Sequence, residues 1–363
     1  MRAKYIMKEG SVLLELKIPK EILKSPVAME IIIASFSQPS VGSYLDAFLN
    51  GKVRSWFSLE LVSLGGQVKF FIWAPKKFKN PIESQVYAQF PTVEVHEVSD
   101  YTLATQFSDI SMWGMQLELT KADPYPIKTY IDYGLDKDPK EEFKIDPMTP
   151  LVEFLASSMG TGHNAWIQFI LRAHKAEDWD STEKKLVDKR WALGASDEVK
   201  KIREKTKSKD SLEPPRRLTK AEEDAILAIE KSVTKPGFDV TIRAVYTAPK
   251  DIFSAAVGAG ITAGLRNYNS GELNGFKGIN NPDVKYSFPW QDRKKKKRNK
   301  LKTNLLDSYK NRGAFYNEFK TEYFVLNTEE LATIYHLPGG VATTPAFDRI
   351  GSKKSEAPSN LPL

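Results

Sequence analysis

The chain has 363 residues, of which 41% are hydrophobic and 27% charged, a globular composition with room for two or three domain-sized units. It has no cysteine, which excludes disulfide bonds and thiolate metal sites and fits a reducing cytosol. Its formal net charge is +7, but the segment Arg293–Lys302 alone holds eight basic residues, which excludes a diffuse basic field over the rest of the chain. The longest apolar runs are shorter than the ~20 residues of a membrane helix, so the chain as given is expected to be soluble.

The first hundred residues predict the element order βαββαβ. An apolar strand over 12–19 precedes a helix that Ser25 caps and Pro26 starts. Alternating residues on both sides of Gly65-Gly66 then predict a tight hairpin, and a second helix (80–90) and a strand (92–98) follow. This order is that of the ferredoxin-like split βαβ arrangement.

A second copy of this unit is predicted from the residues that mark the ends of its elements. Thr149-Pro150 starts a helix as Ser25-Pro26 does, and Pro249 follows a strand as Pro75 does. More residues separate Pro75 from Pro249 than separate Ser25-Pro26 from Thr149-Pro150, so the second copy must contain an insertion between its first helix and this strand. We therefore expect an α+β protein with two ferredoxin-like units from an internal duplication. Unit one spans 1–110, unit two spans 111–347 with insertions near 174–236 and 267–322, and 348–363 form an extended tail.

The insertion near 174–236 is rich in Lys, Glu and Asp. Within it, Thr219 and Glu222 have the spacing of a capping box, and Ile226, Ile229 and Val233 share one helical face. We expect a projecting helical hairpin at this point of the chain.

The insertion near 267–322 contains the basic segment, whose cationic residues are Arg293, Lys294, Lys295, Lys296, Lys297, Arg298, Lys300 and Lys302. One interpretation is a solvated loop. The other is a loop that contacts nucleic-acid phosphates without reading sequence, or that contacts anionic lipid headgroups. Nearby Tyr286, Phe288 and Trp290 would either stack on exposed bases or anchor the loop to the core.

The strand over 322–327 is predicted to close unit two, and a helix follows it. Asn327 and Glu330 form a capping pair, and Pro338 ends the helix. Leu331, Ile334 and Tyr335 form a helical stripe that either packs on its own sheet or docks a partner. The proline-rich end of the chain is expected to be extended.

Catalytic signatures are missing from the sequence. It lacks a phosphate-binding G-x-x-x-x-G-K-[ST] loop, so we expect it neither to hydrolyse ATP nor to bind it tightly. The glycines of 258–264 fit close helix packing better than a nucleotide site. Its four histidines, His96, His163, His174 and His336, lack metal-site spacing. We expect no enzyme, metal or cofactor.

Several long phrases resemble a known family: "ELKIPKEILKSPVAMEI", "SVTKPGFDVTIRAVY", "ELNGFKG" and "VLNTEELATIYHLPGG" are among them. The chain resembles domain-of-unknown-function proteins of small-genome bacteria, encoded beside or fused to ATPases of the type IV secretion coupling-protein and HerA-like class. Members of that family carry apolar N-terminal segments that end in a phrase similar to "RAKYI". In fused relatives, a phrase similar to "LNTEELATIYHLPG" leads toward the ATPase.

The resemblance implies a non-enzymatic accessory platform in the cytoplasm, at the inner face of the cell membrane. Its partner would be a DNA-translocating or secretion-type ATPase acting in trans, as in conjugation. The alternative is a stand-alone single-stranded nucleic-acid-binding protein that uses the basic segment. The sequence indicates no oligomeric state.

Overall fold

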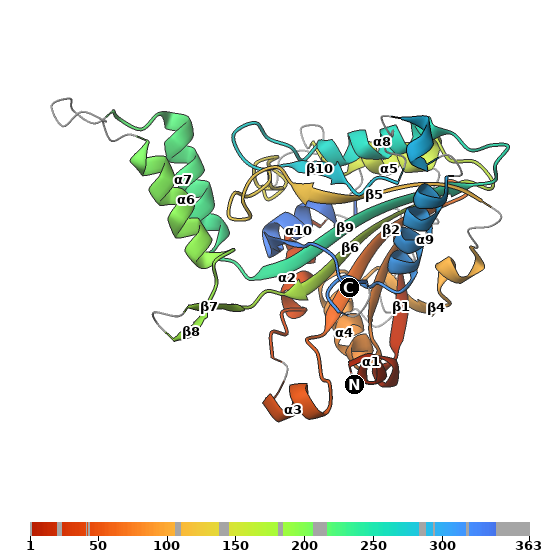
Figure 1. The fold of residues 1–363 in the computed structure, drawn as a ribbon, viewed down its shortest axis with the longest axis horizontal. Helices are drawn as coiled ribbons and strands as arrows, with labels where there is room; N and C mark the ends of the chain where they lie inside the picture. The colour runs from red at the N-terminus through yellow and green to blue at the C-terminus, as the bar shows by residue number, and fades with distance from the viewer. Residues whose placement is uncertain are drawn as a thin grey trace, which may run out of the picture.

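The computed structural model describes residues 2–19, 24–40, 42, 44–105, 110–137, 145–180, 184–205, 216–282, 288–292, 295–316 and 319–338. They contain both helices and strands, and the strands pair in an antiparallel sheet (Figure 1). The α+β class expected from the sequence is confirmed at this level.

One nine-stranded sheet forms the centre of the molecule. Its order is β10-β5-β9-β6-β2-β3-β1-β4, and β11 pairs with β9 beside this path. The strands are β1 (Ser11–Lys17), β2 (Trp56–Leu64), β3 (Gln67–Pro75), β4 (Glu94–Val98), β5 (Ser111–Leu119), β6 (Asn164–Ala173), β9 (Gly237–Ala248), β10 (Phe276–Ile279) and β11 (Phe324–Asn327).

The two halves of the sheet have the same strand order. In the first half, β4, β1, β3 and β2 lie side by side, and in the second half β10, β5, β9 and β6 do so. Each half therefore runs fourth, first, third, second in chain order. The halves meet where β2 pairs with β6, from Trp56 opposite Arg172 to Leu64 opposite Asn164. The strands of both halves thus belong to one continuous sheet.

The last strand differs from the sequence prediction. The edge position beside β5 is taken by β10, with Phe276 opposite Leu119, and not by the segment 322–327. That segment forms β11, which pairs with the beginning of β9. The sequence predicts no strand at "FKGI", because this segment is short and stands among Gly and Asn residues, which favour turns.

The hairpin between β2 and β3 has the turn that its two glycines predict. Leu64 lies opposite Gln67, so Gly65 and Gly66 are the two turn residues, and their φ angles are +60° and +92°. A side chain at Gly66 would place its Cβ 2.5 Å from the carbonyl oxygen of Met159. Both the left-handed backbone and this close approach require glycine there.

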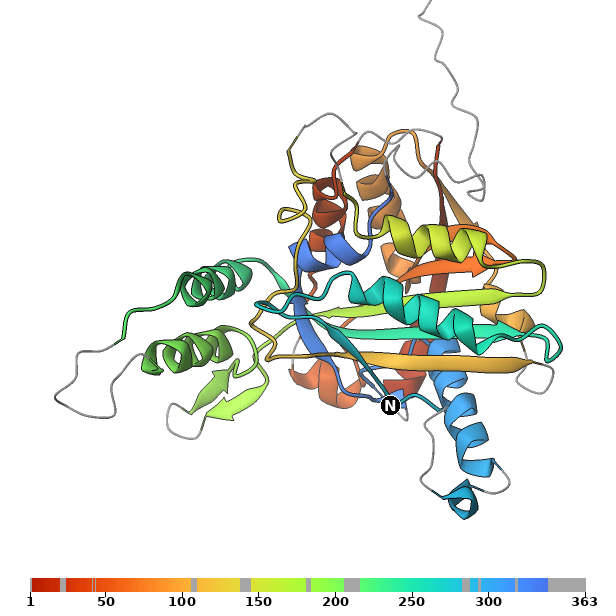
Figure 2. The same ribbon diagram turned by 90° about the horizontal axis from the view of Figure 1, so that it is seen from above.

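Five helices cover one face of the sheet: α2 (Val27–Ser35), α4 (Lys79–Gln89), α5 (Thr149–Ser157), α8 (Ala255–Arg266) and α10 (Thr328–Ile334). Figure 2 shows α5 and α8 side by side over the strands. The main hydrophobic core lies between this layer and the sheet, and it contains Leu59, Phe70 and Phe169 from the strands. Burial of these side chains is the main stabilising term.

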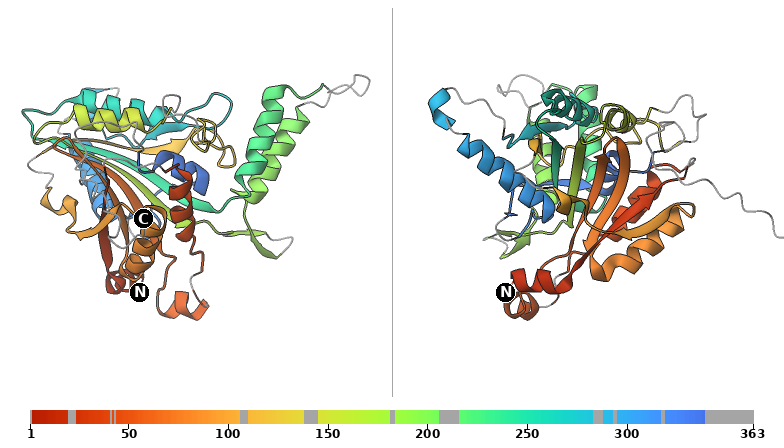
Figure 3. Two further views of the ribbon diagram at one scale, coloured as in Figure 1. Left: turned by 180° about the vertical axis from the view of Figure 1, so that it is seen from behind. Right: turned by 90° about the vertical axis from the view of Figure 1, so that its right-hand side faces the viewer.

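The opposite face carries α9 (Lys296–Lys310), as the right-hand view of Figure 3 shows. Leu306 and Tyr309 of α9 pack in a smaller core with Trp166. Beneath this layer, the sheet register aligns a buried polar row: Glu60 lies opposite Gln168, Gln168 opposite Arg243, and Arg243 opposite Gln116. The last turn of α9 and the segment after it supply hydrogen bonds to this row: Gln168 donates to the Tyr309 carbonyl, and Arg243 donates to the carbonyls of Ser308 and Gly313.

A pair of helices projects from the sheet between β6 and β9, as the sequence predicted (Figure 1). We call α6 (Ala192–Glu204) and α7 (Lys220–Ser232) the arm. Its helices pack through a small core of their own, which contains Val199 from α6 and Ile226 and Ile229 from α7. Thr219 and Glu222 form the predicted capping box. The short hairpin β7 (Asp178–Asp180) and β8 (Lys185–Val187) precedes the arm. Two further helices, α1 (Arg2–Glu9) and α3 (Tyr44–Leu49), lie at the end of the molecule opposite α8.

Candidate functional site

The basic segment is mostly helical, where the sequence predicted a loop. Arg293 and Lys294 lie outside the described residues. Lys295 stands at the N-cap of α9, and Lys296, Lys297, Arg298, Lys300 and Lys302 lie within the helix. Cations at a helix N-terminus oppose the helix dipole. Asp292 offsets them by accepting hydrogen bonds from the backbone amides of Lys297 and Arg298, at 3.0 and 3.1 Å.

Two of the three aromatic residues beside this segment, Phe288 and Trp290, are described, and both are exposed. Phe288 and Trp290 stack on one another, with ring centroids 4.7 Å apart, and Trp290 is 72% exposed. Tyr286 lies outside the described residues. Lys302 is tied to the sheet through a hydrogen bond to the Met112 carbonyl, whereas Lys295, Lys296, Lys297 and Lys300 are exposed. The structure therefore brings an exposed aromatic pair next to exposed cations.

The stripe on α10 faces the core. Leu331, Ile334 and Tyr335 are buried, and the Tyr335 hydroxyl donates a 2.9 Å hydrogen bond to the Phe71 carbonyl. Of the two interpretations of the stripe, packing on its own sheet is the one observed. The alternative that these three side chains dock a partner is not supported, because they fill the space between α10 and the strands.

The predicted capping pair of α10 is present, and it has a further role. Asn327 accepts from the Glu330 amide at 2.9 Å, while Glu330 accepts from the amides of Asn327 and of distant Ile127. Burial raises the pKa of Glu330 to about 8. This carboxyl therefore ties the segment after β5 to the helix, a contact that no local spacing indicates.

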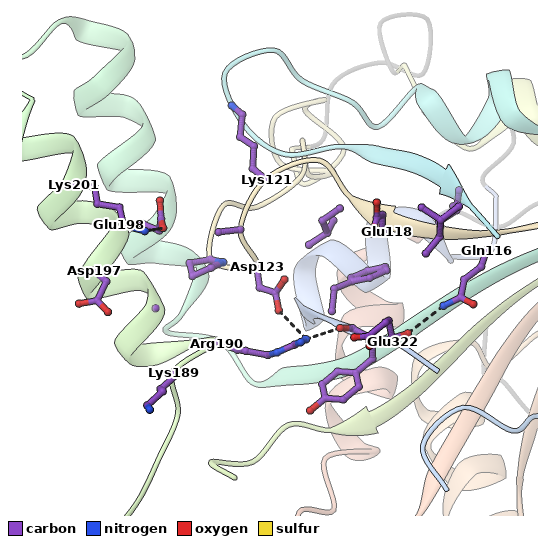
Figure 4. A pocket seen from close by; sticks show the side chains of 18 residues that line it. Gln116, Glu118, Lys121, Asp123, Lys189, Arg190, Asp197, Glu198, Lys201 and Glu322 are labelled. Atoms are coloured by element: carbon purple, nitrogen blue, oxygen red, sulfur yellow. Dashed lines mark hydrogen bonds and ion pairs between the residues drawn. The ribbon is translucent and has the colours of Figure 1, made fainter. Parts of the chain in front are cut away.

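A cleft of about 590 Å³ separates the base of the arm from the sheet (Figure 4). Arg190 lies in it, donates a 2.6 Å hydrogen bond to the Tyr323 carbonyl, and approaches Asp123 to 3.8 Å. Burial raises the pKa of Asp123 to about 6, and Arg190 opposes that rise. Asp123 also accepts from the Val325 amide. These contacts attach β11 to the base of the arm.

The charges lining this arm cleft are mixed. Glu118, Asp197, Glu198 and Glu322 lie around it with Lys121, Lys189 and Lys201, so neither sign dominates. Lys121 donates to the carbonyls of Gly271 and Glu272, and Lys201 pairs with Glu198 at 2.6 Å. Because these two lysines already bind groups within the chain, the arm cleft is better suited to be a structural joint than a ligand site.

A second cavity, of about 520 Å³, has a different character, and we call it the basic–aromatic pocket. Its cations come from four separate stretches of the chain, and its rings come from the segment between α9 and β11. The lining residues are Arg2, Lys52, Val53, Arg54, Arg172, Glu177, Phe315, Tyr316, Lys320 and Tyr323. Distant segments thus converge here because the sheet brings β2 and β6 together.

A buried ionic cluster supports the floor of the basic–aromatic pocket. Arg172 makes hydrogen bonds through Nε and Nη2 to Asp239, with Nε 2.9 Å from the carboxylate, and Arg54 lies 3.7 Å from the same group. His174 contacts Asp239 at 2.5 Å and Asp188 at 3.0 Å. Although burial opposes protonation of His174, hydrogen bonds to Asp188 and Asp239 raise its pKa to about 9. The cluster holds the two arginines in place.

A comparison with protein-family models matches residues 38–349 to DUF8128, a domain of unknown function. The chain belongs to the DUF8128 family. A search of curated proteins finds no match. The matched residues include the arm, α9 and every strand of the central sheet except β1.

Sequence reasoning missed the basic–aromatic pocket of this DUF8128 chain. Arg54 lies just before β2 and Arg172 lies near the end of β6, neither within a local motif, and the β2–β6 pairing brings them together. In the part of the chain that the structure describes, no three His, Cys, Asp or Glu side chains form a group suited to a metal ion. Across those same residues, no helix has the length and hydropathy needed to cross a bilayer.

Proposed function

We propose that this DUF8128 chain is a non-enzymatic accessory platform for a membrane-associated ATPase of the DNA-translocating or secretion type. The partner class comes from the sequence resemblance to chains encoded beside, or fused to, coupling-protein and HerA-like ATPases. The platform would act in trans, in the cytoplasm and at the inner face of the cell membrane.

The arm is the observation that carries this proposal. Its two helices are stabilised by their own small core, so their outer surfaces are not needed for packing against the sheet. Leu227 on α7 is 63% exposed, and the Lys200 side chain on α6 is 71% exposed. A projecting helical pair with apolar and charged outer positions is suited to contact a partner protein.

We also propose that the platform arose by duplication of a ferredoxin-like unit. The shared fourth-first-third-second strand order of the two halves supports this origin. So does the position of Pro75 at the end of β3 and of Pro249 directly after β9, the third strands of the two halves. In this proposal the arm is an insertion between the second and third strands of the second unit.

Co-purification from the native host tests the platform role. A tagged full-length chain is cross-linked in cells, isolated, and its partners are identified by mass spectrometry. We expect a Walker-type ATPase to be enriched over an unrelated tagged cytoplasmic protein. Partners that include no ATPase across cross-linkers of different length would refute the proposal.

The non-enzymatic part of the proposal is tested on the purified chain. Without a glycine-rich loop whose amides cradle phosphates, ATP turnover should stay at the level of a buffer blank. Turnover that survives purification to homogeneity, and that a point substitution in this chain abolishes, would contradict it.

Nonspecific binding of single-stranded nucleic acid is the second candidate function. The exposed Phe288–Trp290 stack next to Lys295, Lys296 and Lys297 favours it, because aromatic faces and lysines together suit unpaired bases and their phosphates. Replacing Trp290 with Ala should then weaken oligothymidylate binding by about tenfold, the effect of losing one stacked base. Unchanged affinity would remove this candidate.

A further inference from the structure

We propose that the basic–aromatic pocket binds a nucleotide unit, that is, a phosphate group and a planar base linked through a sugar. The pocket is separate from the arm and from α9, and the proposal is independent of the platform role. The volume of about 520 Å³ lies in the range of ~300–1,000 Å³ typical of small-molecule sites.

Charge supports an anionic ligand. Arg2, Lys52, Arg54, Arg172 and Lys320 line the pocket together with one carboxylate, Glu177. Arg54 and Arg172 are paired with Glu177 and Asp239. Within the described part of the chain, no ion pair joins Arg2, Lys52 or Lys320 to a carboxylate, although the Asp46 carboxylate lies near Lys52, so the described lining carries an excess of positive charge. A phosphate group would supply the missing negative charge.

The two buried arginines are fixed in place. Their side chains are 3% and 6% exposed, and Arg54 donates a 2.8 Å hydrogen bond to the Ala173 carbonyl. Arg172 is held by Asp239 on one side and donates to the Tyr316 hydroxyl on the other, at 3.2 Å. A ligand therefore meets a floor that is already ordered, and binding costs little side-chain entropy there.

The rings of the pocket supply a place for a planar group. The guanidinium of Arg172 lies 4.5 Å from the ring centroid of Phe315, 5.3 Å from that of Tyr316 and 5.6 Å from that of Tyr323. Tyr316 and Tyr323 are only partly buried, so their ring surfaces border the cavity. Aromatic faces and an arginine plane are the surfaces on which nucleobases stack.

The chemistry fits a nucleotide from either of two sources. It could be a free nucleotide, or one nucleotide of a single strand whose backbone continues out of the pocket. The described residues that line the pocket include no glycine-rich loop that would cradle a triphosphate, so a single phosphate is the better match.

Binding measurements on the full chain test the proposal. The probes are AMP, adenosine, inorganic phosphate and a short oligothymidylate, titrated at low salt and followed by calorimetry. The variant Lys52→Ala/Lys320→Ala removes the two lysines of the pocket lining and leaves the buried arginines intact. Its matched control, Lys76→Ala/Lys250→Ala, removes the same charge from exposed lysines elsewhere. Tyr316→Leu removes a ring, and Tyr316→Phe keeps it.

We expect AMP or the oligonucleotide to bind more tightly than adenosine or phosphate alone. Lys52→Ala/Lys320→Ala should weaken that binding by about tenfold or more, the loss expected for charge-assisted contacts, while the control pair leaves it unchanged. Tyr316→Leu should weaken it more than Tyr316→Phe, which keeps the ring and loses only the hydroxyl that accepts from Arg172. Preference for AMP identifies a free nucleotide, and binding of the strand alone identifies a strand-held one.

Three results would overturn the proposal. The first is that neither AMP nor the oligonucleotide binds to the wild-type chain, while its melting curve shows that it is folded. The second is affinity that does not change in the Lys52/Lys320 variant. The third is oligonucleotide binding that is lost only when Lys295, Lys296 and Lys297 are neutralised, which would place the contact on α9 and support the second candidate function instead.

Discussion

Glu60 on β2 and Arg312 after α9 form a buried ion pair, with Arg312 Nε 2.9 Å from Glu60 Oε1 and side chains 0% and 1% exposed. Tyr101 donates a 2.7 Å hydrogen bond to the other carboxylate oxygen. Asp100 also pairs with Arg312. The pair fixes the chain that follows α9 to the centre of the sheet, where the two halves meet.

Removing the carboxylate should destabilise the fold strongly. In Glu60→Gln the Arg312 charge remains buried with one partner fewer, and breaking a buried pair costs about 3–5 kcal/mol. Urea denaturation measures the loss. The exposed carboxylate of Glu94, replaced in Glu94→Gln, is the control and should change stability by less than about 0.5 kcal/mol. Equal stabilities of the two variants would show that the pair contributes little.

Stability should fall as the pH rises from about 6.5 to 9. The folded chain holds a proton on His174 with a pKa of about 9, whereas the unfolded side chain has its ordinary value near 6.5. The folded state therefore binds more protons than the unfolded state within this window. The stabilisation that the His174 proton provides is fully present below pH 6.5 and is lost above about pH 9.

The variant His174→Gln isolates this contribution. Its unfolding free energy should depend less on pH between 6.5 and 9 than that of the wild type, by about 1–3 kcal/mol over the window. His96 is exposed, so His96→Gln should keep the wild-type dependence. A wild-type slope in His174→Gln would mean that this side chain is neutral in the fold.

Neutralising Lys294 to Lys297 should leave folding intact and reduce binding to nucleic acid or to anionic vesicles. The described members of this set are exposed. Binding by the wild type should also weaken steeply with salt, because each phosphate contact releases counterions. Affinity that responds neither to the substitutions nor to salt would leave the segment as a solvated part of the fold.

Two truncations separate the roles of the C-terminal region. Ending the chain after Gly340 removes polar, proline-rich sequence and should change the melting temperature little. Ending it before Phe324 removes β11 and α10, whose residues are buried, and should unfold or aggregate the protein. If the tail contributes to docking, the shorter truncation lowers ATPase recovery. A large loss of stability from that truncation would instead make the tail structural.

Much of the fold follows from local signals in the sequence. The Gly65-Gly66 turn, the capping boxes at Thr219 and Asn327, and the helical hairpin were predictable because turn and cap chemistry depends on a few adjacent residues. The short strand β10 was not, since four residues among turn formers give too little periodicity.

The candidate sites depend on the pairing of distant strands, which a single sequence does not reveal. Whether the stripe with Leu331 faces the core or solvent is decided by where α10 lies on the sheet, and an amphipathic pattern fits both. The basic–aromatic pocket likewise needs β2 beside β6 before Arg54 and Arg172 can meet. By contrast, the basic segment was found by composition alone, although its helical form was not.

Direct binding between this chain and the ATPase is the most decisive measurement for the platform proposal. The purified ATPase is titrated with the wild type, with Lys200→Glu/Leu227→Glu on the arm, and with the control Tyr87→Glu, an exposed position on α4. We predict a saturable complex that the arm variant weakens by about tenfold or more and that the control leaves intact. The absence of a complex, or equal affinities for all three proteins, would contradict an arm-mediated platform.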